Sequence, residues 1–392
     1  MRQPVFRRRG LIAVVLMIVF AIVLAYTVLP HLVLAALNRA PDGPFPVSPE
    51  AQALHERLFV ADMHADSLLW ARDLAKRSKR GHIDLPRMAE GHVALQMFTA
   101  TTEVPARMNI ERTPRGWDAL VALTFFQRWP AATWRSPFER ARYQARRLGE
   151  LAEASDGRFR VIHNQRELAR FVADREEDSG LMGGLLGIEG GHALEGKIEN
   201  LALLYEAGYR MLGPTHFFDT DLGGSAHGVD KGGITDFGRE VVREMEARRM
   251  IVDLAHASPT LFDDVIAMAT RPLLVSHTGV QGTCDNQRNL SDAQIQAVAD
   301  TGGLVGIGFW TTAVCDRSVA AIVAAMRYAV DRIGIDHVCL GSDFDGATSA
   351  PFDASGMALL TEGMLDAKFS EAEISAIMGG NVLRFLQANL PD

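Results

Sequence analysis

Histidine and acidic residues stand repeatedly at the ends of short apolar runs in this sequence. A single histidine in such a place is more often structural than chemical, but recurrence along one chain favours a shared site. The residues that end these runs are His64 with Asp66, Glu189, His216, His256, His277, and Asp343 with Asp345. Imidazole and carboxylate groups together are typical ligands of Zn²⁺, with Mn²⁺ or Co²⁺ as alternatives. The pattern therefore predicts a metal site.

The number of these residues predicts two metal ions. His64 and Asp66 are two positions apart, and on an extended segment such side chains point to the same side. With Glu189, His256 and His277 the set is too large for one four-coordinate zinc that keeps an open position. We therefore expect two zinc ions, bridged by Glu189, which lies midway between the two groups. Ions about 3.5–4 Å apart could hold a hydroxide between them and polarise a carbonyl group.

Short apolar runs must position these residues, and they alternate with amphipathic stretches. Most runs are hydrophobic almost throughout, as strands buried on both faces are. The runs cover residues 58–64, 92–100, 181–189, 208–216, 249–256, 271–277, 302–310 and 337–346. The alternation predicts a (β/α)₈ TIM-type barrel, with a doubly wound open sheet as the alternative fold. In such a barrel the active site lies at the C-terminal ends of the strands, where these polar residues stand.

Helical patterns separate the strand candidates. The clearest amphipathic stretches cover residues 237–249, 258–269 and 316–334. Ser258 followed by Pro259 is a helix start signal, with an N-cap before a proline at the first helical position. The segment 101–180 exceeds one crossover helix, so we expect an insertion of two or three helices after the second strand. Without a repeat or a second linker, residues 51–392 are expected to form one catalytic domain.

The first residues predict a membrane anchor. Four arginines, Arg2, Arg7, Arg8 and Arg9, precede an apolar run over residues 11–29 that continues less cleanly to residue 37. About 19 apolar residues at ~1.5 Å each span a ~30 Å hydrocarbon core. A cleaved signal peptide, with a shorter apolar run of about 7–15 residues, is the alternative. Because basic flanks stay in the cytoplasm, we expect residues 1–37 to be the anchor and the rest of the chain to be exported.

A proline-rich and polar stretch follows the anchor and is expected to be a linker. It covers residues 38–50 and contains no motif, so truncation near residue 45 is expected to leave an active enzyme. The 392-residue chain has 48 acidic and 40 basic residues and a net charge of −8, which argues against a nucleic-acid partner. Its cysteines fit neither a disulfide framework nor a cysteine zinc site, and a single bridge is left open among Cys284, Cys315 and Cys339.

Longer segments are similar to one family of enzymes. They follow the family's order and agree in more than the candidate ligands, over about residues 55–388. The segments are DMHAD (62–66), HIDLPRMAEGHVALQMF (82–98), GIEGGHALEG (187–196), LGPTH (212–216), GGITDFGREVVREME (232–246), VDLAHAS (252–258), SHTG (276–279) with QRNLSD (287–292), LGSDFDG (340–346) and GGNVLRF (379–385). On these motifs the chain resembles the membrane dipeptidase (renal dipeptidase) family. The resemblance implies a (β/α)₈ metallopeptidase that hydrolyses dipeptides at a two-zinc site.

The resemblance also implies a role for each matching residue. By this resemblance the zinc ligands would be His64 and Asp66 for the first ion and His256 and His277 for the second ion. Glu189 would bridge the two ions. His216 would contact the substrate carbonyl and the tetrahedral intermediate. Arg288 would take the C-terminal carboxylate of the dipeptide, with Asn289 as a further substrate contact. Asp343 would be the catalytic acid and base.

Substrate preference stays open at this point. Residues 67–70 read SLLW where the family often has Leu-Pro, and the loop 217–233 differs from that of the mammalian members. An N-acyl-amino-acid deacylase, or another amide or lactone hydrolase, could use the same metal barrel, because a fold does not determine function. An inactive membrane-anchored binding protein is less expected, since the ligand set and Asp343 are all present. The sequence does not separate a monomer from a homodimer.

Overall fold

A curled parallel sheet forms the centre of the protein in a computed structural model that describes residues 4–392. Its strands are β1 Val60–Ala65, β2 Val93–Thr101, β3 Phe159–Val161, β4 Met182–Glu189, β5 Tyr209–Gly213, β6 Ile251–Val252, β7 Leu274–Thr278, β8 Leu304–Ile307 and β9 Val338–Leu340. They pair in the order β6-β5-β4-β2-β1-β9-β8-β7, and β3 pairs with β4. The end strands meet at a parallel bridge between Asp253 and Leu274. This arrangement is consistent with a TIM-type barrel.

Each predicted strand corresponds to an observed one, and β3 is an addition that the sequence patterns did not indicate. The addition lies in the long segment between β2 and β4, together with three α-helices. β3 is a short three-residue strand and only partly buried, so it lacks the continuous apolar run by which the other strands were recognised.

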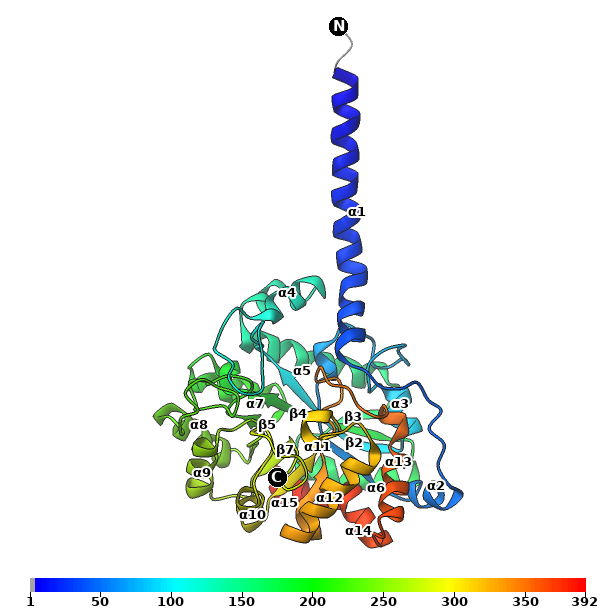
Figure 1. Cartoon of the computed structure of the whole chain (residues 1–392), viewed down its shortest axis with the longest axis vertical. Coiled ribbons are helices and arrows are strands. Elements are labelled where there is room, and N and C mark those ends of the chain that lie inside the picture. The colour runs from blue at the N-terminus through cyan, green and yellow to red at the C-terminus, as the bar shows by residue number, and fades with distance from the viewer. Residues whose placement is uncertain (1–3) are drawn as a thin grey trace.

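Helices surround the sheet, and one further helix, α1, projects away from it (Figure 1). They are α1 Pro4–Leu37, α2 Pro49–His55, α3 Leu85–Glu90, α4 Ala119–Phe126, α5 Pro137–Ala154, α6 Gln165–Glu177, α7 Ile198–Glu206, α8 Asp236–Ala247, α9 Pro259–Met268, α10 Asp292–Asp300, α11 Thr311–Val314, α12 Val319–Ile333, α13 Ala358–Asp366, α14 Glu371–Ser375 and α15 Asn381–Asn389. The predicted start of α9 is confirmed, because the Ser258 side chain accepts a hydrogen bond from the Leu261 amide and Pro259 is the first helical residue.

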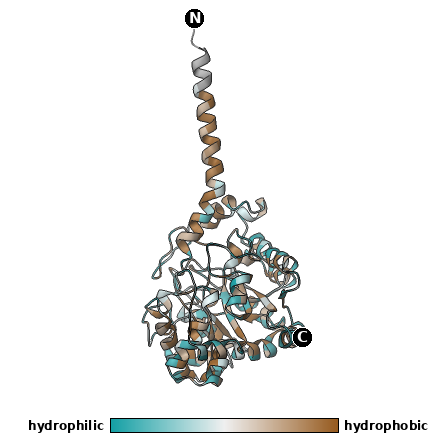
Figure 2. Ribbon diagram, turned by 90° about the vertical axis from the view of Figure 1, so that its right-hand side faces the viewer, coloured by the Kyte–Doolittle hydropathy of each residue, from teal (hydrophilic) through white to brown (hydrophobic). Residues whose placement is uncertain are grey.

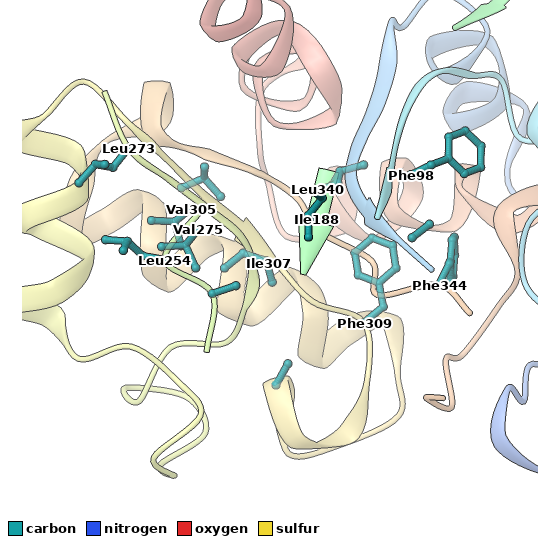
Figure 3. Packing of buried hydrophobic residues seen from close by; sticks show 14 of the residues in the cluster. Phe98, Ile188, Leu254, Leu273, Val275, Val305, Ile307, Phe309, Leu340 and Phe344 are labelled. Atoms are coloured by element: carbon teal, nitrogen blue, oxygen red, sulfur yellow. The ribbon is translucent and has the colours of Figure 1, made fainter. Parts of the chain in front are cut away.

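Apolar side chains fill the space between strands and helices. Figure 3 shows Val275, Ile307 and Leu340 from neighbouring strands packed in one cluster. The C-terminal helix α15 adds Phe385 and Leu386 to a second cluster that contains residues of β1, β2 and β4. This packing holds the strands in place, so that the polar residues at their C-terminal ends are brought to one region.

The long helix α1 projects away from the sheet and its helices (Figures 1 and 2). From Gly10 to Leu37 its mean hydropathy reaches 3.0, and its apolar side chains are exposed from Leu11 to Leu24, as a membrane-spanning helix requires. Pro30 lies inside the helix without ending it. Arg2, part of the predicted cytoplasmic flank, lies outside the described residues. The helix is consistent with the predicted anchor.

The stretch predicted as a linker is in contact with the catalytic domain. The Asn38 side chain accepts a hydrogen bond from the Ala347 amide at 2.8 Å, and the Arg39 amide donates to the Thr348 carbonyl at 3.1 Å. Further along, Phe45 packs against the main apolar cluster. The linker expectation rested on composition, and composition does not reveal these tertiary contacts.

Candidate metal centre and active-site cavity

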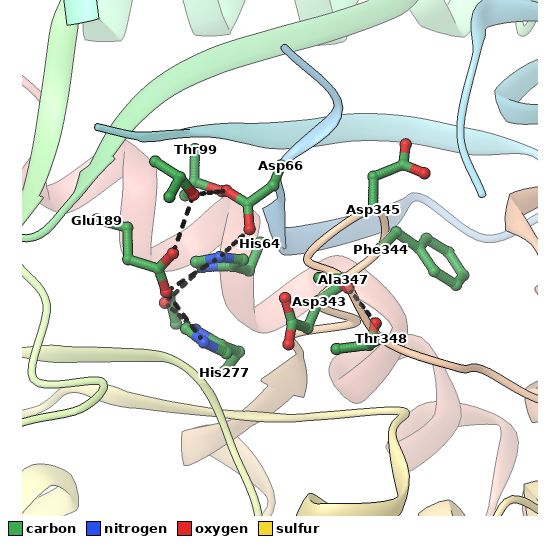
Figure 4. A network of polar contacts seen from close by, with 12 residues as sticks. His64, Asp66, Thr99, Glu189, His277, Asp343, Phe344, Asp345, Ala347 and Thr348 are labelled. Atoms are coloured by element: carbon green, nitrogen blue, oxygen red, sulfur yellow. Dashed lines mark hydrogen bonds and ion pairs between the residues drawn. The ribbon is translucent and has the colours of Figure 1, made fainter. Parts of the chain in front are cut away.

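The predicted ligands come together around Glu189, the last residue of β4 (Figure 4). One carboxylate oxygen, Oε1, lies 3.0 Å from Nε2 of His256, 3.4 Å from Nε2 of His277 and 3.6 Å from Nε2 of His64. Each of these side chains is buried. Three histidines from separate strand ends therefore each direct their Nε2 atom at Oε1 of Glu189.

Three overlapping groups of ligand atoms, each within 4.8 Å of one another, occupy this region. They are His64–Glu189–His277, Glu189–His216–His256, and His64–Asp66–Asp343. Glu189 belongs to two of them, as a bridging residue would. His216 lies as close to Glu189 as the other histidines do, with Nε2 3.3 Å from Oε2. Distance alone therefore does not separate a substrate-contacting role of His216 from a ligand role.

A buried serine and aspartate determine which ring nitrogens carry protons. The Ser276 hydroxyl donates to Asp253 Oδ2 at 2.6 Å, so its oxygen can only accept from the histidines. It lies 2.9 Å from Nδ1 of His277 and 3.1 Å from Nδ1 of His64. Both rings are therefore protonated at Nδ1 when neutral, and both present an Nε2 lone pair to Glu189. Metal-ligating histidines are usually oriented in this way.

His256 reaches the same protonation state by another route. Nδ1 of His227 lies 2.8 Å from the Ile110 carbonyl, which can only accept, so that nitrogen carries the proton. Burial lowers the pKa of His227 to about 4 and keeps the ring neutral. Its Nε2 then accepts from Nδ1 of His256 at 3.1 Å. The Nε2 atoms of His256 and His277 consequently face each other at 3.0 Å with lone pairs, which fits a cation bound by both.

The buried carboxylates of Glu189 and Asp66 favour a positive charge beside them. Burial and the nearby Asp66 carboxylate together raise the pKa of Glu189 to about 8. Asp66 itself accepts hydrogen bonds from the Thr99 and Thr101 hydroxyls at 2.8 and 3.0 Å. Burial alone would lower the pKa of His64, but Glu189 and Asp66 raise it to about 10, so a proton takes the cation's place when no metal is bound. Imidazole nitrogens and carboxylate oxygens are the donor set that suits zinc.

Asp343 follows β9 and faces this cluster (Figure 4). Its φ of 59° lies in the left-handed region, which non-glycine residues rarely adopt and which is enriched at functional sites. The Thr348 hydroxyl donates to its backbone carbonyl at 2.8 Å, and its carboxylate is directed to His64 and Asp66. Burial raises the pKa of Asp343 well above its usual range. A carboxyl group in this state can both accept and release a proton.

Asp345, two residues later, has a structural role. It points away from Glu189 in Figure 4 and is fully buried. Its carboxylate accepts hydrogen bonds from the Ser67 hydroxyl at 2.6 Å and from the His82 amide at 2.7 Å, and it forms an ion pair with Arg72. These contacts hold the loop after β9 in place.

Arg288 lies at the cavity and Asn289 does not. The Arg288 guanidinium donates to the His277 carbonyl at 2.8 Å and lies 5.5 Å from the centre of the Trp310 ring. The loop that carries it is linked to the end of α11 by a disulfide between Cys284 and Cys315. The Asn289 amide instead accepts from the Gly279 amide and donates to the Cys284 and Ala313 carbonyls. The polar atoms of Asn289 therefore bind the loop backbone, and its contact with substrate stays a prediction.

A cavity of about 690 Å³ opens over the cluster. Its charged and imidazole groups are Asp66, Glu189, His216, His227, His256, His277, Arg288 and Asp343. Apolar side chains from α1, from α4, from the loop between β2 and α4 and from the segment after β1 line much of the rest. A molecule with a polar centre and an apolar portion would complement such a cavity.

Sequence reasoning missed the residues that support the ligands. Asp253 stands three positions before His256, and Ser276 stands one position before His277. Both lie inside apolar runs. A polar residue in a strand buried on both faces needs a partner, and that was the available signal. His227 and its partner His256 are 29 residues apart in sequence, so their pairing could not be read from the chain.

Comparisons with known proteins agree with the geometry. A sequence profile described as membrane dipeptidase (peptidase family M19) matches residues 48–390. A crystal structure of the M19 metallopeptidase described as dipeptidase AC has a TM-score of 0.71 and 27% identity, covering 86% of this chain and 99% of that one. A Rhodobacter sphaeroides metallopeptidase, solved with a phosphinate mimic of the dipeptide L-Ala-D-Ala, has a TM-score of 0.70 and 26% identity, covering 85% and 99%. Dipeptidase 3 of Mus musculus is 32% identical over 51% of this chain and 43% of its own length, so less than half of that relative is spanned.

Proposed function

Because this chain belongs to the membrane dipeptidase family of metallopeptidases, we propose that it hydrolyses dipeptides with a free C-terminal carboxylate at a two-zinc centre. The observation that carries the proposal is the convergence of the Nε2 atoms of His64, His256 and His277 on the Glu189 carboxylate. The Nδ1 atom of each ring is hydrogen-bonded to Ser276 or to His227. Nitrogen lone pairs that surround a carboxylate in this way are the arrangement by which histidines hold a metal ion.

The two ions would be held by different strand ends. We assign His64 and Asp66 to the first, His256 and His277 to the second, and Glu189 to both. When bound, the pair of ions would activate a water molecule as the nucleophile and polarise the scissile carbonyl. The threonine hydroxyls on Asp66 and the Ser276–Asp253 pair would keep the ligands in position.

The remaining residues would bind the substrate and move protons. Arg288 can form two parallel, charge-assisted hydrogen bonds with the C-terminal carboxylate. Burial lowers the pKa of His216 to about 3, so the ring stays neutral, and as a neutral ring it can contact the carbonyl oxygen. Asp343 would accept a proton from the attacking water and deliver it to the leaving amine.

A substrate panel with Arg288→Ala tests this function. We expect zinc-loaded protein to cleave Ala-Ala faster than N-acetyl-alanine, because the proposed reaction is that of a dipeptidase. Arg288→Ala should raise KM for Ala-Ala strongly and for Ala-Ala-amide much less, since only the free acid uses the guanidinium. Arg288→Lys keeps the positive charge but not the two parallel hydrogen bonds of the guanidinium. Its KM for Ala-Ala should therefore lie between that of the unmodified enzyme and that of Arg288→Ala.

Two results would contradict the proposal. Equal loss on the free and amidated dipeptides would remove Arg288 as the carboxylate anchor. Faster cleavage of N-acetyl-alanine than of Ala-Ala would favour the acyl-amino-acid hydrolase that the sequence left open. Arg332→Ala, which changes an exposed arginine on α12 away from the cavity, is the matched control.

We also propose the finer organisation of the chain. Residues 51–392 would form one closed (β/α)₈ domain, with an insertion between β2 and β4, residues 38–50 would connect it to the anchor, and residues 1–37 would be the anchor. The Cys284–Cys315 disulfide supports export of the domain, because disulfides persist in oxidising compartments. A homodimer stays one of the two assembly states that the sequence left open.

The orientation of the anchor can be measured directly. A C-terminal fusion to alkaline phosphatase, which is active only after export, should be active in intact cells, because the arginines before the apolar helix stay in the cytoplasm. A fusion to a reporter that works only in the cytoplasm should be inactive. The reverse pair of results would place the catalytic domain inside the cell.

A further inference from the structure

The last turns of α1 line the same cavity as the metal-site residues. Leu29, Val33 and Leu37 are spaced four residues apart, so they share one face of the helix, and all three line the cavity. Leu34, on the adjacent face, packs in a cluster with Leu69 and Trp70. The helix therefore continues beyond its membrane-spanning part to become a wall of the active site.

Hydrogen bonds connect this wall to the catalytic loop. Asn38 and Arg39, directly after α1, bind the backbone of Ala347 and Thr348, four and five residues after Asp343. The Thr348 hydroxyl in turn donates to the Asp343 carbonyl. The expectation that truncation near residue 45 leaves the site intact therefore conflicts with the structure, because truncation removes both the wall and these contacts.

The rest of this wall is also apolar. It is formed by Leu69 and Trp70 after β1, by Leu120, Leu123 and Phe126 of α4, and by Met108, Ile110 and Trp117 before α4. Trp117 and Met108 are 62% and 42% exposed. Single exposed apolar residues are ordinary, but a continuous apolar wall beside a charged centre is typical of a binding subsite.

The position of Arg288 indicates which part of a dipeptide meets this wall. Arg288 follows β7, whereas the wall is built after β1 and β2 and is attached to the loop after β9. In the sheet β8 and β9 separate β7 from β1, so the two features lie on different sides of the cavity. With the C-terminal carboxylate on Arg288, the amino-terminal residue extends toward α1.

We propose that the end of α1 is a specificity-determining wall, which makes the enzyme selective for dipeptides with a large apolar side chain on the amino-terminal residue. The inference rests on the proposed function, because it uses Arg288 as the carboxylate anchor. An apolar side chain there displaces water from Val33 and Leu37, whereas an alanine side chain is too short to do so. Hydrophobic pockets of this kind discriminate by roughly 10- to 200-fold.

The test uses the full chain in detergent, loaded with zinc, and the three dipeptides Phe-Ala, Ala-Phe and Ala-Ala. We expect kcat/KM for Phe-Ala to exceed the other two by roughly tenfold or more. Val33→Ser with Leu37→Ser should remove most of this preference, so that kcat/KM for Phe-Ala falls toward that for Ala-Ala. Leu32→Ser is the matched control, because Leu32 is 59% exposed on the same helix and does not line the cavity.

Each outcome bears on a separate statement. Absence of a preference for Phe-Ala in the unmodified enzyme, or equal effects of the double variant and Leu32→Ser, overturns the inference and leaves the proposed function standing. Failure to cleave any of the dipeptides overturns the proposed function and the inference together. If the double variant also loses Ala-Ala hydrolysis, Leu123→Ser on the facing helix α4 repeats the test, and loss confined to Phe-Ala supports the wall.

Discussion

Glu189→Gln is expected to abolish both metal binding and dipeptide hydrolysis. The Glu189 carboxylate lies between the Nε2 atoms of His64, His256 and His277, and it is the group that would join the two ions. The amide of glutamine removes the negative charge and replaces one oxygen by an NH₂ group, which cannot bind a cation. Metal content by mass spectrometry and kcat for Ala-Ala should fall together, from two zinc ions per chain to fewer than one.

The control is a buried carboxylate outside the cavity. Glu103 is 7% exposed and lies near Arg115, and burial also raises its pKa, so Glu103→Gln makes a similar chemical change elsewhere. It should keep both ions and the activity. If Glu189→Gln retains two zinc ions and near-normal turnover, Glu189 is not the bridge.

Asp343→Asn is expected to lower kcat by about 10²–10⁴-fold while both zinc ions stay bound. Asparagine has nearly the same shape, but it can neither take a proton from the attacking water nor give one to the amine. Its effect should fall on kcat more than on KM, because Arg288 and not Asp343 is assigned to hold the substrate. Parallel measurements of kinetics and zinc content check both parts.

Two outcomes would reassign Asp343. A loss of less than about tenfold is too small for a general acid and base. Loss of one zinc ion would make Asp343 a ligand, which its position beside His64 and Asp66 also permits. The comparison variant is Asp345→Asn, which breaks a buried ion pair with Arg72 and should reduce stability by about 3–5 kcal/mol, seen as a lower unfolding temperature.

The sequence was sufficient to predict a barrel-like parallel sheet and to single out the polar residues that gather at one end of it, because both depend on local patterns. A strand buried on both faces must be apolar throughout, so a polar residue at its end is conspicuous, and His64, Glu189 and His277 were found in this way. The apolar length of α1 and the Ser258–Pro259 helix start are local signals of the same kind.

The tertiary structure decided everything that depends on contacts between distant segments. Asn289 follows Arg288 in sequence, but the loop turns its amide toward the Gly279 and Ala313 backbone, away from the cavity. The pairing of Cys284 with Cys315 was likewise undetermined until the loop after β7 and the end of α11 were placed together.

The same distinction applies to protonation and to substrate access. Ser276 and Asp253 lie 23 residues apart, yet their hydrogen bond determines which nitrogens of His64 and His277 carry protons. Val33 belongs to a helix whose composition indicates only a membrane span, and its place in the cavity wall follows from how α1 packs on the domain. Sequence patterns record the environment of each residue along its own segment, whereas these features arise where separate segments meet, and only the folded chain brings those segments together.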